Sequence, residues 1–147
     1  MDTQRAKEFE SHVIDYFLNN KAISISHYTL LDEQIHKGEN RQGIEIKNDQ
    51  SFEKYGNLYI SVKRVYSYQE HTSGLYKNQH WLYVIGIKHS FWIFSTKLLR
   101  QYYEQNKPEL KRGFTSPKGG TEYGFILNKA QADELCVEKY DNQLKLL

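Results

Sequence analysis

The chain has few of the residues and segments on which several common kinds of protein depend. Cys136 is its only cysteine, which excludes an internal disulfide and a zinc site built from cysteines. No apolar run approaches the roughly 20 residues that a membrane-spanning helix needs. The six histidines show neither H-x-H nor HExxH spacing, so a histidine-bound metal is disfavoured. No glycine-rich loop ends in the Gly-Lys-Ser/Thr of a Walker motif.

Signs of internal division are also missing. No repeat, low-complexity tract or linker interrupts the 147 residues, so we expect a single domain over residues 1–147, large enough to bury a core. The first residues lack the charged-then-apolar layout of a signal peptide, and a cytoplasmic location is the default expectation. A net charge of +2 is compatible with a nucleic-acid partner without requiring one.

Hydrophobic periodicity predicts a mixed α/β domain. A helix is expected from Thr3 to about Asn20, and a short helix should be opened by Asn128. Strands are expected over 26–35, around Glu45 and Lys47, over 58–63 and over 123–127. The remaining expectations are a polar loop over 48–56, a long loop over 66–79, a hairpin of 81–87 with 91–94, and a helix capped by Ser95 or Thr96.

The strand that carries Glu45 is the most informative segment. Charged and apolar residues alternate in it, so Glu45 and Lys47 should project from one face while Ile44 and Ile46 enter a core. If this strand forms an antiparallel hairpin with the strand before it, Asp32 would lie about 5 Å from Glu45 across the ladder. Taken alone, the E-x-K pattern also fits an ordinary surface strand.

The chemistry of these groups suits a divalent cation. Mg²⁺ prefers oxygen ligands, and it usually takes one or two carboxylates together with water and a substrate phosphate. Asp32 and Glu45 would supply the carboxylates, and the main-chain carbonyl of Ile46 could add a further ligand. Lys47 would place its ammonium near the charge that develops during attack on phosphorus.

The residues around this strand form a longer motif. Gly38-Glu39-Asn40, Gly43-Ile44-Glu45-Ile46-Lys47-Asn48-Asp49, Phe52 and Gly56-Asn57-Leu58-Tyr59-Ile60 together resemble a PD-(D/E)XK nuclease family of bacteriophages and bacterial mobile elements. The resemblance is close over residues 32–63 and looser over 81–94. It implies a restriction-endonuclease-like core, in which helices flank a central mixed sheet. It also implies Asp32 and Glu45 as metal ligands, Lys47 as the catalytic lysine, and Mg²⁺ as the cofactor, with Mn²⁺ as a substitute.

Three further positions could belong to the site. An acid on the first helix often joins it in this superfamily; Glu10 is the candidate and Glu8 the alternative, although either could be an ordinary solvated acid. Asp49 shares the parity of Glu45, but an Asn-Asp pair after a strand also forms turns. Ser61 stands where the family pattern has a glutamate, and this departure puts activity in doubt.

The expected partner is DNA, with RNA left open and a homodimer possible. The basic, glycine-rich segment over 107–120 could hold the nucleic-acid backbone through Lys111, Arg112 and Lys118, or it could be a solvated loop. The sequence therefore predicts a metal-dependent endonuclease. The alternatives are a DNA-binding protein that kept the scaffold but lost turnover, and a small domain that serves protein contacts.

Overall fold

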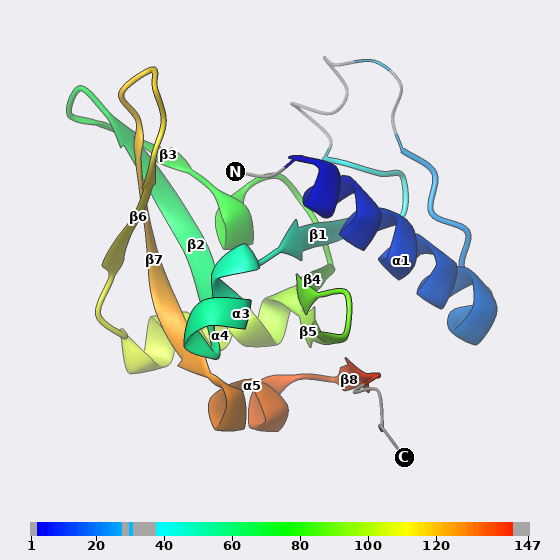
Figure 1. Ribbon diagram of the computed structural model, residues 1–147. Coiled ribbons are helices and arrows are strands. Elements are labelled where there is room, and N and C mark those ends of the chain that lie inside the picture. The colour runs from blue at the N-terminus through cyan, green and yellow to red at the C-terminus, as the bar shows by residue number, and fades with distance from the viewer. Residues whose placement is uncertain (1–2, 28–29, 31–37, 143–147) are drawn as a thin grey trace.

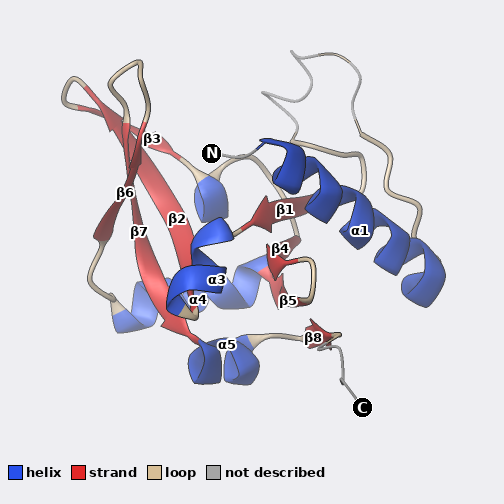
Figure 2. Ribbon diagram, viewed as in Figure 1, coloured by secondary structure: helices blue, strands red, loops and turns tan. Residues whose placement is uncertain are grey.

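The computed structural model describes residues 3–27, 30 and 38–142 (Figure 1). Helices and strands are interleaved along the chain (Figure 2). The helical elements are α1 (Thr3–Lys21), α3 (Gln50–Tyr55), the 3-10 turn η1 (Gly74–Tyr76), α4 (Thr96–Asn106) and α5 (Lys129–Leu135). The strands are β1 (Ile44–Asn48), β2 (Asn57–Tyr66), β3 (Gln69–Thr72), β4 (Leu82–Ile87), β5 (Ser90–Ser95), β6 (Lys111–Thr115), β7 (Thr121–Asn128) and β8 (Glu138–Asp141).

The described strands form two sheets of four. In the first the order is β1-β4-β5-β8, and β1 runs parallel to β4 while the other neighbours are antiparallel. The second, β3-β2-β7-β6, is antiparallel throughout. The mixed α/β class predicted from the sequence is confirmed. The expectation of one central sheet is wrong, because β2 does not pair with β1. It pairs with β3 and β7 in the second sheet.

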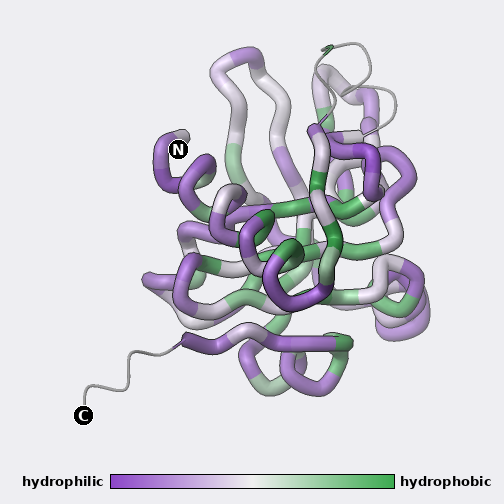
Figure 3. The backbone as a smooth tube through the Cα atoms, turned by 90° about the vertical axis from the view of Figure 1, so that its right-hand side faces the viewer, coloured by the Kyte–Doolittle hydropathy of each residue, from purple (hydrophilic) through white to green (hydrophobic). Residues whose placement is uncertain are grey.

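The first sheet is buried on both faces. One face carries Leu82, Val84, Phe91 and Ile93 and packs on α1. The opposite face carries Tyr83, Ile85, Trp92 and Phe94 and packs on the apolar side of the second sheet, with α4 and α5 closing the ends of this layer. This double burial explains why β4 and β5 are almost continuously apolar rather than alternating. Figure 3 shows these hydrophobic segments running through the interior.

Local sequence signals account for several elements. Phe9, Val13 and Phe17 recur at helical spacing and are the buried residues of α1, as expected. The side chain of Ser95 accepts a hydrogen bond from the Leu98 amide and begins α4. Asn128 opens α5 with a complete capping box. The predicted β4–β5 hairpin is confirmed, although β5 begins one residue earlier than expected, with Ser90 opposite Ile87.

Other expectations are wrong. The loop predicted over 48–56 contains α3, because Asp49 accepts a hydrogen bond from the Ser51 amide and caps a short helix there. The loop predicted over 66–79 contains β3 and η1. The strand over 121–128 is not the last, since β8 follows α5 and completes the first sheet.

The strand predicted over 26–35 falls largely outside the described residues. Where the chain is described, His27 forms an isolated antiparallel bridge with Asn40, and the Arg41 amide donates to the Ser26 carbonyl over 2.9 Å. These contacts bring the segment at 26–27 beside the residues that lead into β1. None of the helices in the described part of the chain is both long and apolar enough to cross a bilayer.

The turn η1 is pressed against β2 at a glycine. Gly74 has a φ of +50°, and a Cβ atom added there would lie 2.4 Å from the Ser61 carbonyl oxygen. Gly56, at the end of α3, has a similar φ of +71° but no neighbour within 4 Å of the same added atom. The two glycines therefore separate the cost of a left-handed backbone from the cost of a steric clash.

We predict that Gly74→Ala destabilises the protein by about 3 kcal/mol, because it adds overpacking to backbone strain. Gly56→Ala, the matched control, should cost only about 1 kcal/mol. Urea unfolding of the two variants measures both values. Equal destabilisation would show that η1 does not pack tightly on β2.

Candidate functional site

The site begins with the alternation of β1. Ile44 and Ile46 are buried on the face that packs on α1, as predicted. Glu45 and Lys47 point to the other face, toward the second sheet. The Glu45 side chain is only 5% exposed, whereas that of Lys47 is 37% exposed. A surface strand with alternating charges would leave both groups in water, so burial of Glu45 argues against that interpretation.

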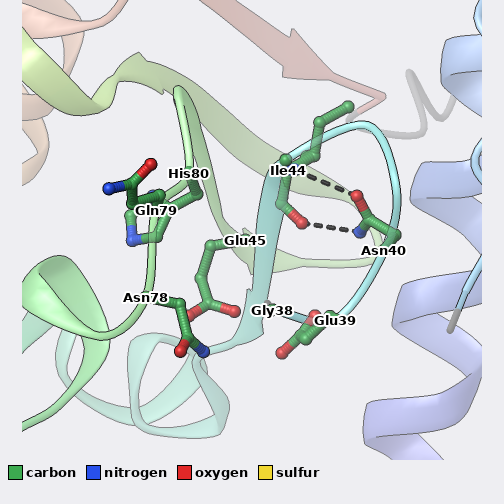
Figure 4. A pocket seen from close by; sticks show the side chains of 9 residues that line it. Gly38, Glu39, Asn40, Ile44, Glu45, Asn78, Gln79 and His80 are labelled. Atoms are coloured by element: carbon green, nitrogen blue, oxygen red, sulfur yellow. Dashed lines mark hydrogen bonds between the residues drawn. The ribbon is translucent and has the colours of Figure 1, made fainter. Parts of the chain in front are cut away.

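Two carboxyl groups and an ammonium meet at this point. In Figure 4 the side chain of Glu45 extends from β1 toward Glu39, which belongs to the segment just before the strand. Lys47 Nζ lies 4.0 Å from Glu45 Oε2 and 4.0 Å from Glu39 Oε1. Among the described residues, the second carboxyl oxygen of Glu39 is buried and has no hydrogen-bond donor. The pair of acids is therefore incompletely neutralised.

The protonation of Glu45 follows from its surroundings. Burial raises the pKa of its carboxyl to about 7, and Glu39 adds to the increase, while Lys47 and His80 oppose it. A hydrogen bond between the carboxyl groups of Glu45 and Glu39 requires a proton on one of them. Near neutral pH, Glu45 is therefore poised between a protonated acid and an anion that needs a positive partner.

Asn40 holds the segment that presents Glu39. Its side chain is 2% exposed and makes two hydrogen bonds with one residue of β1. Asn40 Nδ2 donates to the Ile44 carbonyl over 2.7 Å, and the Ile44 amide donates to Asn40 Oδ1 over 3.0 Å. Figure 4 shows both bonds. Asn40 thus fixes the distance between Glu39 and the strand that carries Glu45.

The opposite wall of the site comes from the segment before β4. His80 Nε2 lies 3.2 Å from the Gly74 carbonyl, which can only accept, so this nitrogen carries the proton. Its Nδ1 lies 2.8 Å from Thr96 Oγ1. Burial lowers the pKa of the His80 imidazole, consistent with a neutral ring that is fully hydrogen-bonded. His80 therefore serves as a structural wall between η1 and α4.

These segments enclose a small cavity. It is lined by Gly38, Glu39, Asn40, Gly43, Ile44, Glu45, Asn78, Gln79 and His80. Its volume of about 10 Å³ is close to what one water molecule requires. A space of this size beside two carboxyl groups suits a single small ion or water.

The other predicted metal ligands and the helical acids have mixed outcomes. Asp32 lies outside the described residues, and no described contact tests the carbonyl of Ile46. Glu10 Oε1 lies 3.2 Å from His27 Nε2, and His27 Nδ1 lies 3.1 Å from the Glu39 carbonyl oxygen. Glu10 thus reaches the backbone of the site through a histidine, whereas Glu8 is exposed and hydrogen-bonded to Gln4.

Asp49 and Ser61 have structural partners. Asp49 Oδ1 accepts from Ser51 at the start of α3, and Oδ2 accepts from the Tyr59 amide over 2.7 Å. Ser61 lies on β2 in the second sheet, where its hydroxyl is 2.5 Å from that of Ser73. This contact does not test whether turnover was lost at Ser61, which stays a prediction.

The predicted basic contacts lie on the second sheet. Lys111 and Arg112 are exposed on β6, and Lys118 is exposed in the turn that joins β6 to β7. Lys111 Nζ is 3.3 Å from Glu109 Oε2. Among the residues that the structure describes, no hydrogen bond or ion pair joins these three side chains to Glu39 or Glu45.

Sequence reasoning missed two residues of the site. Glu39 and Asn40 stood in the motif Gly38-Glu39-Asn40 and were given no role. Their position in the motif was the available signal, because a turn just before a strand can fold an acid back onto that strand. The described residues contain no group of three or more His, Cys, Asp or Glu side chains placed to hold a metal. What they contain is a pair of acids.

Comparison with protein-family models, with curated proteins and with solved structures finds no match for this chain.

We predict that Asn40→Ala destabilises the protein by about 3 kcal/mol, because it leaves a buried amide and a buried carbonyl of Ile44 without partners. Asn106→Ala, which removes one exposed bond to the Tyr102 carbonyl, is the matched control and should cost about 0.5 kcal/mol. Denaturant unfolding compares the two. Similar costs would contradict the role given to Asn40.

Glu45 should also give stability a distinctive pH dependence. Its folded pKa of about 7 exceeds the ordinary value of 4.5, so the folded state binds the proton more tightly. The stability contributed by neutral Glu45 is therefore complete below pH 4.5 and is lost as the pH rises through 7. Above that pH the ionised group costs the fold roughly 3 kcal/mol.

We predict that Glu45→Gln stabilises the protein at about pH 8 by up to about 3 kcal/mol and has little effect at about pH 5. The same exchange at exposed Glu134 is the control and should leave the pH profile unchanged. Melting temperatures in EDTA across this pH range provide the test. A wild-type profile in Glu45→Gln would refute the account of Glu45.

Proposed function

We propose that this protein is a metal-dependent nuclease that hydrolyses phosphodiester bonds in DNA. The observation that carries the proposal is the buried Glu45 beside the partly exposed Glu39, with the ammonium of Lys47 4.0 Å from each carboxyl group. The resemblance of residues 32–63 to PD-(D/E)XK nucleases supports the same chemistry. A buried carboxyl group beside a second acid is of little use to a purely structural strand, since its burial costs stability.

The donor set fits Mg²⁺. A buried Glu39 oxygen without a hydrogen-bond donor and a neighbouring carboxyl with a raised pKa are groups that a divalent cation would satisfy. Glu39 and Glu45 would hold the ion, and the resemblance adds Asp32. When bound, Mg²⁺ supplies charge that polarises a phosphate oxygen and lowers the pKa of a water molecule.

The chain's own groups have separate tasks. Glu45 must give up its proton before it can serve as a ligand, and its surroundings place that loss near neutral pH. Lys47 is much more exposed than Glu45, so its ammonium stands between the acid pair and solvent. From there it would neutralise negative charge that develops on the phosphoryl oxygens. Asn40 keeps Glu39 in position beside Glu45 and Lys47.

We predict that the protein cleaves DNA with Mg²⁺ or Mn²⁺, that EDTA abolishes cleavage, and that Lys47→Ala lowers the rate on the order of 100-fold or more. The substrates should include linear, branched and single-stranded DNA. Lys63→Ala is the matched control. Lys63 is similarly exposed and also pairs with a glutamate, Glu70, but it lies on the second sheet.

Lys63→Ala should cut at the wild-type rate, and both variants should keep the wild-type melting temperature within a few degrees. Wild-type cutting by Lys47→Ala would exclude the role of this lysine. Salt-dependent binding to DNA without cleavage under either metal would contradict the nuclease proposal and support a DNA-binding protein without turnover.

A further inference from the structure

Trp81 is a large aromatic side chain held rigidly at the surface. It is 57% exposed, although it directly precedes the fully apolar strand β4. Its Nε1 donates to the Gln42 carbonyl over 2.6 Å, and its Cδ1 lies 3.1 Å from the point where a Cβ atom on Gly43 would stand. The five-membered ring is thus fastened to the backbone, while more than half of the residue stays exposed.

The backbone around Trp81 is fixed as well. Its amide donates to the Gly43 carbonyl over 2.9 Å, and its carbonyl accepts from the Thr96 amide over 3.0 Å. Both bonds tie the residue to neighbouring elements of the first sheet and α4. A side chain anchored in this way loses little conformational entropy when a ligand binds to it.

Trp81 lies beside the acid pair. Tyr83 is in register with Glu45 across the parallel β1–β4 ladder, so the two side chains share a face of the sheet. Trp81 is two residues before Tyr83, and its amide donates to the carbonyl of Gly43, two residues before Glu45. This places the Trp81 backbone about 7 Å along the strand and about 5 Å across from that of Glu45. Trp81 contacts Gly43 and directly follows His80, and both of these residues line the cavity.

We propose that Trp81 is a stacking platform for an unpaired nucleobase of the strand whose phosphate reaches Glu39, Glu45 and Lys47. This inference rests on the proposed function for the nature of the ligand. An indole offers a flat apolar surface that stacks on any base. Its position one strand repeat from the acids is close to the spacing between a phosphate and the adjoining base.

Two cations on neighbouring elements suit the same ligand. Lys97 is exposed one residue after Thr96, whose amide donates to the Trp81 carbonyl, and Lys47 is partly exposed on β1 near Glu45. Basic groups that follow the backbone and an aromatic side chain that stacks on a base are the combination that binds single strands. In an intact duplex each base is already stacked on its neighbours, so the platform favours an unpaired, frayed or flipped nucleotide.

The two tryptophans of the chain allow a direct test by fluorescence. Trp92 is 0% exposed and donates to Asp133 Oδ1, so only Trp81 can stack on an added base. In EDTA, which prevents cleavage, a single-stranded oligonucleotide of thymidine or uridine should quench part of the wild-type emission. Trp81→Phe retains only the Trp92 emission and should show no quenching.

Affinity measured by fluorescence anisotropy completes the test. Trp81→Leu should bind the thymidine oligonucleotide roughly tenfold more weakly or worse, and Trp81→Phe should recover part of the loss because phenylalanine also stacks. An abasic oligonucleotide of equal length should not quench, and a blunt duplex should quench much less. Comparison of the thymidine and uridine strands distinguishes DNA from RNA as the source of the base.

Failure of the stacking proposal is distinguishable from failure of the proposed nuclease function. Unchanged affinity in Trp81→Leu, or equal quenching by the abasic strand, overturns the stacking platform even if Mg²⁺-dependent cleavage is intact. Quenching that depends on the base supports the platform even if no cleavage is found. Wild-type melting temperatures in both Trp81 variants ensure that lost binding reflects the lost ring.

Discussion

Burial of the Glu45 carboxyl beside segments 38–43 and 78–80 is the constraint from which the features of the site follow. Removing an ionised carboxylate from water is costly, so such a group stays protonated or acquires positive charge nearby. Here Lys47 supplies part of that positive charge, while Glu39 adds a second acid and so increases the need for it. The fold maintains this unfavourable arrangement through Asn40, whose two hydrogen bonds prevent Glu39 from moving away. Retained electrostatic strain of this kind is typical of functional sites.

Much of the local structure could be predicted from the sequence. The helix α1, the strand β1, the hairpin of β4 and β5, and the caps at Ser95 and Asn128 depend on neighbouring residues only. The division into two sheets could not be predicted, because β2 pairs with β7, more than fifty residues away in sequence. Short elements were also missed, since the six residues of α3 and the four of β3 carry too little periodicity to stand out from loops.

The site was predictable to a similar degree. Alternation along β1 correctly placed Glu45 and Lys47 on one face, and the motif around them indicated acid-and-lysine chemistry. The burial of Glu45 could not be predicted, because it depends on segments 38–43 and 78–80, which lie beside it only in the folded chain. Glu39 was not assigned, because its approach to Glu45 requires the turn that Asn40 fixes. Trp81 looked like an ordinary strand residue until the structure showed its ring outside the core.

The central claim is that Glu39 and Glu45 together hold a divalent cation, and direct binding of Mn²⁺ tests it most closely. Electron paramagnetic resonance counts free and bound Mn²⁺ without any substrate or turnover. The account predicts a site on the wild-type protein that Mg²⁺ displaces, that weakens as the pH falls below about 7, and that is lost in both Glu39→Gln and Glu45→Gln. Undiminished Mn²⁺ binding in either variant, or no binding by the wild-type protein at neutral pH, would contradict it.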